Sequence, residues 1–204
     1  MKSLTPPERW SSLEKIWAEA WAMLAGAVLD SKNPLRTPVL GTVGPEGSHL
    51  RTVVLRRVVK AERWIMFNTD LRSSKVQDIQ VQPRLSWLFY HPQERVQLRL
   101  AGQASLLQAG PLVDEEWSRL SPLNRRDYCT VDPPGSPLTM PGSGLPDSFG
   151  QTPTPDESEI GRRNFVVVRC QVDFLDWLLL QESGHLRAQF TWQDNKLSAT
   201  WVTP

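Results

Sequence analysis

The chain has 204 residues, of which 40% are hydrophobic and 22% charged, and this composition predicts one folded domain over residues 1–204. Lys and Arg number 23 against 22 Asp and Glu, so there is no charge excess of the kind that nucleic-acid binding requires. No apolar run long enough to span a membrane and no apolar leader occur, and the two cysteines, Cys129 and Cys170, are too few for a disulfide framework, so we expect a cytoplasmic protein without a membrane anchor.

The N-terminal segment predicts a helix over residues 5–30. Thr5-Pro6-Pro7-Glu8 has the pattern of a capping box with proline in the first turn. Apolar residues then recur at steps of three and four, which gives the helix one stripe for packing on a core. The stripe consists of Trp10, Leu13, Trp17, Trp21, Leu24 and Val28. A contact between two copies of the chain is the alternative use of these tryptophans.

From Thr37 onward the hydrophobic period becomes that of strands. Strands are predicted over residues 37–43, 49–59, 63–69, 85–90, 95–107, 164–180, 185–192 and 197–202. Residues 44–47 predict a hairpin turn, and residues 73–82 and 111–120 predict short helices. The apolar run of residues 85–90 predicts a buried strand. Many short strands with few helices predict a mainly β protein, a barrel or a sandwich.

Residues 121–161 predict one long irregular loop. Seven of the 17 prolines lie between Val131 and Ile160. The segment has almost no apolar residues to bury, which argues against a second domain. Loops of this length in a compact protein are usually functional or disordered.

Three polar segments carry the candidate chemistry. The segment of residues 51–57 places three arginines among β-branched residues, where a guanidinium needs an anion or water. Residues 67–75 run from a strand end into a helix start, where free N–H groups, hydroxyls and Lys75 suit a phosphate. The third segment, residues 94–99, contains Gln97, whose side-chain amide can both donate hydrogen bonds to the edge of a heterocycle and accept them from it. Each segment alone is equally consistent with a solvated strand face or an ordinary helix cap.

Taken together, the order and spacing of these segments resemble the pyridoxamine 5'-phosphate oxidase family and its wider class of flavin-binding split barrels. The matching stretches are Arg51-Thr52-Val53-Val54-Leu55-Arg56, Phe67 to Lys75, Gln82-Pro83-Arg84, Leu88-Phe89 and Glu94-Arg95-Val96-Gln97. The resemblance is clear over residues 37–107 and weak in the C-terminal strands. It implies an FMN-binding split β-barrel, mainly β with a few helices, and a homodimer with FMN at the subunit interface.

The resemblance also implies a role for each matching residue. Arg51 and Lys75 would hold the FMN phosphate, because charge-assisted hydrogen bonds to a phosphate are strong. Asn68 and Thr69 would lie against the flavin, and Gln97 would contact the edge of the isoalloxazine ring. The full set of predicted cofactor-binding residues is Arg51, Thr52, Val53, Val54, Leu55, Arg56, Asn68, Thr69, Ser73, Ser74, Lys75, Gln97 and Arg187.

Two residues in the matching segments differ from those of the family, so the family's roles do not carry over to them directly. Ser74 stands where relatives have an arginine, and the neighbouring Arg72 is expected to compensate for the missing cation. Arg56 takes the place of a lysine that in the oxidase reaches the substrate and the flavin. Arg51 and Arg56 are an odd number of residues apart, so a regular strand would aim them at opposite faces. Both serve one ligand only if the strand is bulged or the cofactor crosses its end.

The parts that grip the substrate in the oxidase differ here. Trp117 and Ser121 lie near the positions where a tyrosine and an arginine are needed. The segment from His185 to Arg187 reverses the family's order of arginine and histidine. We therefore expect a divergent, oxidase-related protein and not a true pyridoxamine phosphate oxidase.

The leading functional hypothesis is an FMN-dependent oxidoreductase that acts on a small molecule of unknown identity. No catalytic residue is assigned, because His49, His91 and His185 are each more often structural. The alternatives are a flavin-binding electron carrier without turnover, or a split barrel that binds another ligand such as haem or a deazaflavin. No metal site is expected, since the histidines are scattered and no Cys-x-x-Cys occurs. The loop of residues 121–161 is expected to cover the substrate side of the flavin.

Overall fold

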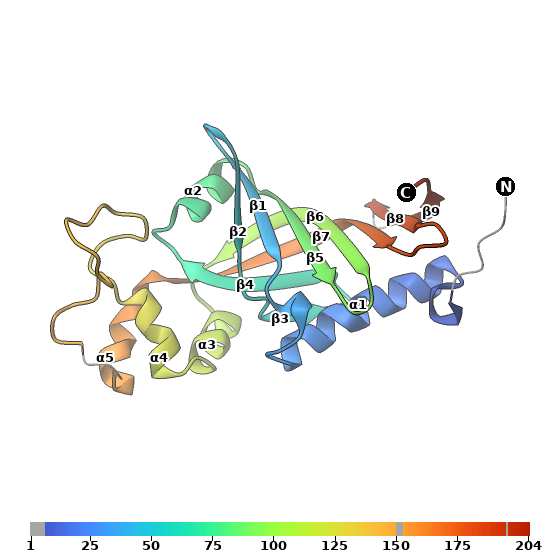
Figure 1. Ribbon diagram of the computed structural model, residues 1–204. Coiled ribbons are helices and arrows are strands. Elements are labelled where there is room, and N and C mark those ends of the chain that lie inside the picture. Colours follow the sequence, from blue (N-terminus) through green and yellow to red (C-terminus); the bar gives the residue numbers. More distant parts are fainter. Residues whose placement is uncertain (1–6, 150–152, 195) are drawn as a thin grey trace.

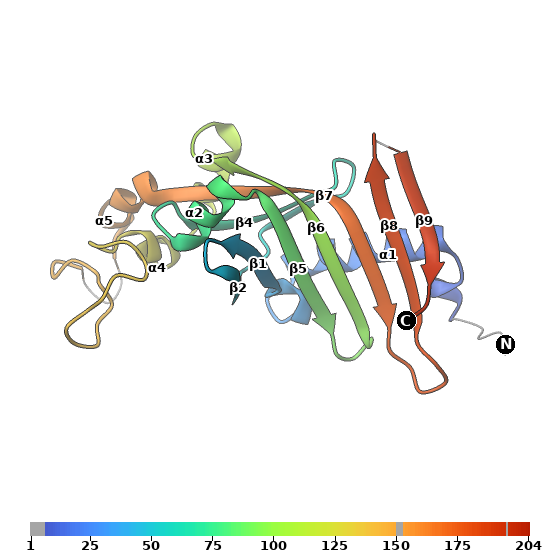
Figure 2. The same cartoon turned by 90° about the horizontal axis from the view of Figure 1, so that it is seen from above.

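The structure, a computed structural model, describes residues 7–149, 153–194 and 196–204. In this part of the chain nine strands form one antiparallel sheet that curls into a barrel (Figure 1). Along the sheet the order is β2 (Gly47–Thr52), β1 (Val39–Gly44), β5 (Arg84–His91), β6 (Val96–Leu107), β7 (Phe165–Leu179), β4 (Trp64–Asp70) and β3 (Arg57–Val59). Strand β8 (Leu186–Gln193) pairs with β7, and β9 (Lys196–Val202) pairs with β8. Seen from above, β8 and β9 extend the sheet beyond the barrel (Figure 2).

Helices cover two regions of the barrel. Helix α1 (Leu13–Leu29) lies along the barrel between two short 3-10 turns, η1 (Glu8–Trp10) and η2 (Pro34–Arg36). Helix α2 (Ser74–Val81) packs against β1. The remaining helical segments gather at the end of β7 that lies away from α1 (Figure 1). They are α3 (Pro111–Ser118), α4 (Pro122–Arg125), η3 (Arg126–Tyr128), α5 (Pro155–Glu159) and η4 (Ile160–Asn164).

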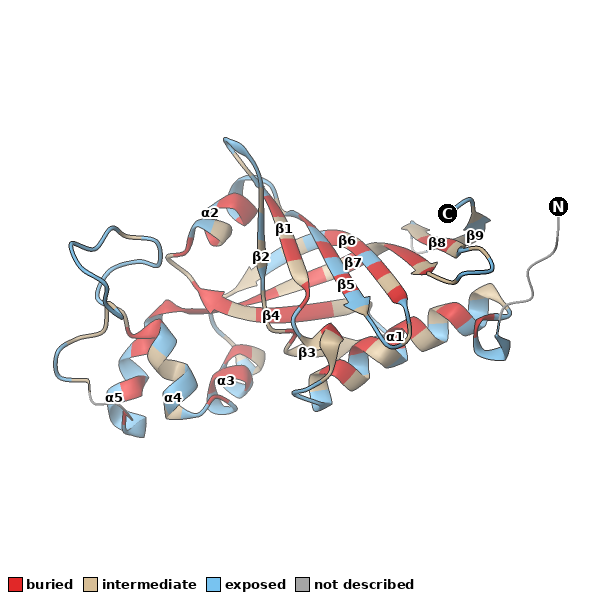
Figure 3. Ribbon diagram, in the orientation of Figure 1, coloured by how far each residue is buried: buried red, intermediate tan, exposed pale blue. Residues whose placement is uncertain are grey.

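The N-terminal helix begins later than predicted. Helix α1 starts after Ser12, whose hydroxyl accepts a hydrogen bond from the N–H of Lys15 at 3.2 Å. The expected cap at Thr5 lies outside the described residues. The prediction that the apolar stripe packs on the core is confirmed, because Trp10, Trp21 and Leu24 are fully buried (Figure 3). The helix therefore begins after Ser12, where a hydroxyl caps its first turn and its apolar residues begin to pack on the core.

Three predicted segments differ from the structure. The strand over residues 49–59 is interrupted, because residues 53–56 leave β2 and pair elsewhere: the N–H of Arg56 donates to the carbonyl of Met66 at 2.9 Å. The apolar run of β5 is buried on one face only, since the outer face of the sheet leaves Leu88 39% and Tyr90 45% exposed. The loop over residues 121–161 contains α4, η3 and α5, and its irregular part over residues 131–149 is largely exposed (Figure 3).

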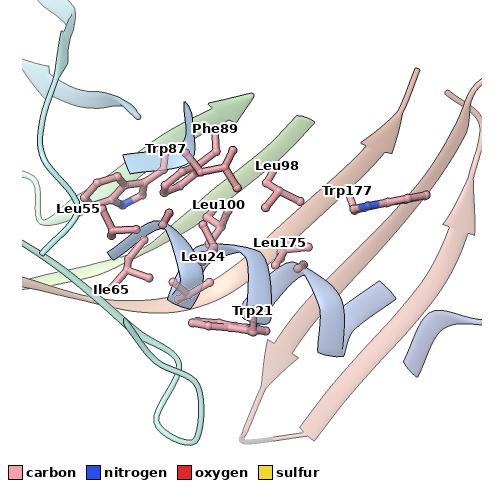
Figure 4. Close-up of a cluster of buried hydrophobic side chains, with 14 of the residues drawn as sticks. Trp21, Leu24, Leu55, Ile65, Trp87, Phe89, Leu98, Leu100, Leu175 and Trp177 are labelled. Atoms are coloured by element: carbon pink, nitrogen blue, oxygen red, sulfur yellow. The ribbon is translucent and has the colours of Figure 1, made fainter. Parts of the chain in front are cut away.

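Two apolar clusters lie on opposite faces of β4. Ile65 and Phe67 belong to the main core inside the barrel, whereas Met66 belongs to a second cluster under α3 and η3. In the main core, residues of the barrel strands meet Trp21 and Leu24 of α1 (Figure 4). The second cluster consists of Met66, Val113, Trp117, Leu120, Tyr128, Phe165 and Val167. No helix in the described residues is long and apolar enough to cross a membrane.

Candidate functional site

Residues from β2, β4 and α2 meet at one end of the barrel. The Nζ of Lys75, in the first turn of α2, donates to Oγ1 of Thr69 at 3.1 Å. The hydroxyl of Ser73 lies 3.5 Å from the same Thr69 oxygen. Burial and the nearby charge of Arg51 both lower the pKa of Lys75. The structure therefore brings together four of the predicted cofactor-binding residues, which we call the cationic cluster: Arg51, Thr69, Ser73 and Lys75.

Arg51 is held in place by the β1–β2 hairpin. Its Nη1 donates to Oγ1 of Thr42 at 2.5 Å and to the carbonyl of His49 at 3.0 Å. Its Nη2 lies 3.6 Å from Oδ2 of Asp78. Burial lowers the pKa of Arg51, and Asp78 offsets part of this effect. Burial lowers the pKa of both Arg51 and Lys75, so the cluster would be stabilised by a further anion.

The start of α2 adds backbone donors to the cationic cluster. The hydroxyl of Ser73 donates to the carbonyl of Asp70 at 2.7 Å and does not cap the helix. The first N–H groups of α2 are thus without a side-chain cap, at the positive end of the helix dipole. Ser74 is exposed beside them. Backbone donors, hydroxyls and two cations in this arrangement fit a phosphate group.

Arg72 does not replace the missing arginine at Ser74, so that prediction is wrong. Its Nη2 lies 2.7 Å from Oδ2 of Asp70, and its Nη1 donates to the carbonyl of Thr130 at 3.0 Å. Asp70, two residues earlier in the chain, already neutralises this guanidinium. Arg72 therefore ties the start of the long loop to the turn before α2.

The interruption of the strand after Thr52 decides whether Arg51 and Arg56 must point to opposite faces. Because residues 53–56 belong to no strand, the alternation of a regular strand does not apply between the two arginines. The guanidinium of Arg56 forms no ion pair with a carboxylate of the described residues. Leu55, by contrast, is a core side chain whose N–H donates to the carbonyl of Arg36 at 2.8 Å. The expectation that Leu55 contacts the cofactor is therefore wrong for its side chain. Its neighbours Thr52, Val53 and Val54 are more exposed.

Asn68 precedes Thr69 on β4, and its side chain lies on the other face of the strand, the face of Met66. Both its amide nitrogen and its amide oxygen are buried and have no hydrogen-bond partner. Leaving such a group unpaired costs about 1–3 kcal/mol. The edge of a flavin ring offers both donors and acceptors, so it would satisfy an amide here. Asn68 thus fits the flavin contact that the sequence predicts.

Gln97 and Arg187 lie in a different region, on the outer face of the sheet. The register places them in one row across β6, β7 and β8, separated by Leu178. Gln97 lines an open groove of about 300 Å³ together with Val39, Gly41, Leu50, Ser86, Trp87, Leu88 and Arg99. No hydrogen bond or ion pair in the described part of the chain links Gln97 or Arg187 to the cationic cluster. The chain therefore holds the predicted site as two separate groups.

Arg187 is fixed by a carboxylate that the sequence analysis did not single out. Its Nη2 lies 2.7 Å from Oδ2 of Asp176, which also accepts from Nε2 of Gln189 at 3.0 Å. Burial by itself raises the pKa of Asp176. The hydrogen bonds from Arg187 and Gln189 and the charges of Arg187 and Arg99 outweigh burial, so the pKa lies below its ordinary value.

The lowered pKa of Asp176 predicts a pH-dependent contribution to stability. A carboxyl with a lowered native pKa stabilises the fold above its unfolded pKa, near 4, and loses this contribution as pH falls through the native value. Asp176→Asn should therefore lower the free energy of unfolding by about 2–3 kcal/mol at pH 7, and the difference should shrink below about pH 4. Urea denaturation at several pH values measures it. Asp173→Asn, in the exposed pair with Arg84, is the control and should cost less than about 1 kcal/mol.

Two further residues that were compared with the oxidase have structural roles. The indole N–H of Trp117 donates to Glu159 at 3.0 Å, and its ring packs on Phe165. The hydroxyl of Ser121 caps α4 by accepting from the N–H of Asn124 at 3.3 Å. Neither side chain is therefore available for the substrate grip of the oxidase. No group of His, Cys, Asp and Glu side chains within the described ranges could hold a metal ion.

The structure adds Thr42, His49 and Asp78 to the residues around the cluster. Asp78 follows Lys75 by three residues, and residues at this spacing share a helix face, so the sequence did contain a signal for it. Thr42 and His49 face each other across the hairpin. That pairing, however, depends on a strand register that the sequence does not reveal.

The comparisons with known proteins agree on one family. Residues 16–108 match the model of the FMN-binding domain of pyridoxamine 5'-phosphate oxidase. The structure is similar to a pyridoxamine 5'-phosphate oxidase-related, FMN-binding protein from Nostoc punctiforme, with a TM-score of 0.71 and 26% identity over 92% of this chain and 97% of that chain. It also shares the fold of PhzG from Burkholderia lata, solved with tetrahydrophenazine-1-carboxylic acid, with a TM-score of 0.73 and 17% identity over 100% of this chain and 99% of that chain. No curated protein matches the chain.

The matched range contains the candidate site. Every predicted cofactor-binding residue except Arg187 lies within residues 16–108. The donors of the cationic cluster and the unpaired amide of Asn68 suit the phosphate and the ring of FMN, respectively. Residues 16–108 therefore match an FMN-binding domain of the pyridoxamine 5'-phosphate oxidase type, with FMN as the cofactor.

Proposed function

We propose that the protein is an FMN-dependent oxidoreductase that works as a homodimer, with each flavin held between two subunits. The observation that carries the dimer is the separation of the site into the cationic cluster and the outer-face residues Gln97 and Arg187. A two-fold axis would place the outer face of one copy against the cluster of the other, so that two identical sites form.

The outer face has the properties of such a subunit contact. Leu50, Leu88 and Tyr90 are 72%, 39% and 45% exposed, and exposed apolar side chains on neighbouring strands favour a protein partner. Gln97 lies among them in the groove. Arg187, oriented by Asp176, would approach the flavin from the same face. The dimer would thus bury the apolar surface and complete the site in one step.

The roles of the residues follow from this arrangement. Arg51, Lys75 and the start of α2 bind and orient the phosphate, and Asn68 and Gln97 hydrogen-bond the polar edge of the ring. Bound FMN would supply hydride acceptance and electron transfer, while the protein supplies position and charge. Arg56, whose guanidinium has no carboxylate partner in the described residues, would add positive charge beside the ring.

The loop after η3 lies in position to border this site. Arg72 donates to the carbonyls of Thr130 and Val131 at 3.0 and 3.3 Å, directly beside the turn that begins α2. We propose that the loop covers the substrate side of the flavin.

The cytoplasmic location also stays a prediction. It is supported by Cys129 and Cys170, which are both buried as free thiols.

Reduction of the bound flavin tests whether the protein turns over. We expect NADH or NADPH to bleach the visible flavin bands of the loaded protein under nitrogen, and air to restore them over repeated cycles. Free FMN at the same concentration is the control. A bound flavin that stays oxidised with both nucleotides would instead favour the electron carrier. That second candidate is supported by the structural roles of Trp117 and Ser121.

A further inference from the structure

Asp78 is a buried carboxylate beside the phosphate-binding residues. Its side chain is 5% exposed, and it lies on α2 three residues after Lys75. Its Oδ2 accepts a hydrogen bond from Oγ1 of Thr42 at 2.6 Å and lies 2.9 Å from Nδ1 of His49. Burial by itself raises the pKa of Asp78. The hydrogen bonds from Thr42 and His49 and the charges of His49 and Arg51 outweigh burial and keep the pKa below its ordinary value. Asp78 is therefore ionised at neutral pH.

The close approach of α2 to the hairpin depends on Gly44. A Cβ at this position would lie 2.6 Å from Oδ1 of Asp78 and 2.6 Å from Cε1 of His49. Any other residue would push the side chains of Asp78 and His49 out of these positions. The lack of a side chain at Gly44 thus permits the contacts through which Asp78 reaches β1 and β2.

A short chain of hydrogen bonds connects Asp78 to Arg51. The hydroxyl of Thr42 donates to Asp78 and accepts from Nη1 of Arg51 at 2.5 Å. The Nη2 of Arg51 lies 3.6 Å from the same carboxylate oxygen. A long arginine side chain loses up to about 2 kcal/mol of rotamer entropy when it is fixed. These contacts fix the guanidinium before any ligand binds, so ligand binding would not have to supply this entropy cost.

We propose that Asp78 is a positioning residue for the FMN phosphate, which acts through Thr42 to hold the guanidinium of Arg51 in its binding orientation. The inference rests on FMN binding at the cationic cluster. The direction in which FMN affinity changes when Asp78 is removed separates positioning from simple electrostatic repulsion. A negative charge this close to a phosphate site repels the phosphate, so its removal alone would tighten FMN binding. Loss of positioning has the opposite effect.

The experiment compares FMN and riboflavin, which differ only in the phosphate. Affinities of the full chain are measured by the quenching of flavin fluorescence at fixed pH and salt. Asp78→Asn should weaken FMN binding about tenfold, and riboflavin binding should change less than about twofold. In the Arg51→Ala background the same substitution should no longer weaken FMN binding, because there is no guanidinium left to position and only the repulsion of the phosphate is removed. Thr42→Val removes the bridging hydroxyl without removing the carboxylate and should weaken FMN binding in the same direction.

Four results would overturn the proposal. FMN affinity that is unchanged or tighter in Asp78→Asn shows that the carboxylate does not position Arg51. An equal loss for FMN and riboflavin shows a general effect on the fold. If Asp78→Asn does not fold, Thr42→Val decides, and full FMN affinity in that variant excludes the hydrogen-bonded chain. A wild-type protein that binds no FMN overturns the assignment of the cluster as the phosphate site as well. If Arg51→Ala weakens FMN binding and Asp78→Asn does not, that assignment stands and only the role of Asp78 is overturned.

Discussion

Arg51→Ala and Lys75→Ala should each weaken FMN binding by roughly 10- to 150-fold. A hydrogen bond to a charged group contributes about 1.5–3 kcal/mol, and about 1.4 kcal/mol corresponds to a factor of ten in affinity. Both side chains are partly desolvated at the cluster, where Asp78 lies beside Arg51 and the charge of Asp70 acts on Lys75. The phosphate would provide the negative charge that they lack. Equilibrium dialysis or fluorescence titration with FMN measures the effect.

Arg84→Ala is the matched control for these substitutions. Arg84 is also an arginine on a strand, but it pairs with Asp173 at 2.8 Å on the surface, and its side chain is 45% exposed. Its removal should leave FMN affinity within about twofold of the wild type, since exposed ion pairs contribute little. If all three variants lose FMN equally, the positive charge of the whole chain and not the cationic cluster controls binding. If none loses FMN, the phosphate is bound elsewhere.

Gly102→Ala should cause the largest loss of stability among single-methyl additions. Gly102 lies at the bulge where β6 pairs with β7, the longest pairing in the sheet. An added Cβ would lie within 2.7 Å of the carbonyl carbon of Gln171 and 2.9 Å of Cα of Val172. These are backbone atoms of a buried strand, so they cannot rotate away as a side chain would. We expect the free energy of unfolding to fall by about 3 kcal/mol, which corresponds to roughly 6–12 °C in melting temperature.

Gly26→Ala is the opposite case and serves as the control. Gly26 lies inside α1, and apart from the backbone of the helix itself no atom lies within 4 Å of the position that its Cβ would take. Alanine favours a helix over glycine by about 1 kcal/mol, so this variant should be more stable than the wild type. Denaturant unfolding of the two variants side by side gives the comparison. A Gly102→Ala protein as stable as the wild type would show that the bulge can relax.

The sequence predicted most strands because their apolar residues alternate against a single core. Val96, Leu98 and Leu100 illustrate this, since all three are buried on the inner face of β6 as expected. The break at residues 53–56 was not predictable, because it arises when the chain leaves β1 to pair with β4 and close the barrel. The exposed side chains of β5 were missed for a related reason. An apolar run does not reveal whether one of its faces stays exposed to solvent.

The candidate site was predictable in part. Arg51 and Lys75 meet as expected, because the barrel brings β2 beside the start of α2. Arg72 failed as a replacement cation since Asp70 lies two residues earlier and captures its guanidinium. Within the described residues of one chain, no hydrogen bond or ion pair links Gln97 or Arg187 to the cluster, and local spacing contains no information about where a second copy of the chain would bind.

Sedimentation of the purified protein with FMN tests the central claim most directly, namely that the cluster and the outer face form one flavin site between two subunits. The flavin absorbance should sediment with a mass of twice 23.2 kDa, at one FMN per chain, after unbound FMN is removed. A mixture of refolded Arg51→Ala and Gln97→Ala chains should retain flavin better than either variant alone, since a mixed dimer has one intact site. Flavin that sediments with a single chain, or remains free at the top of the cell, would contradict the account.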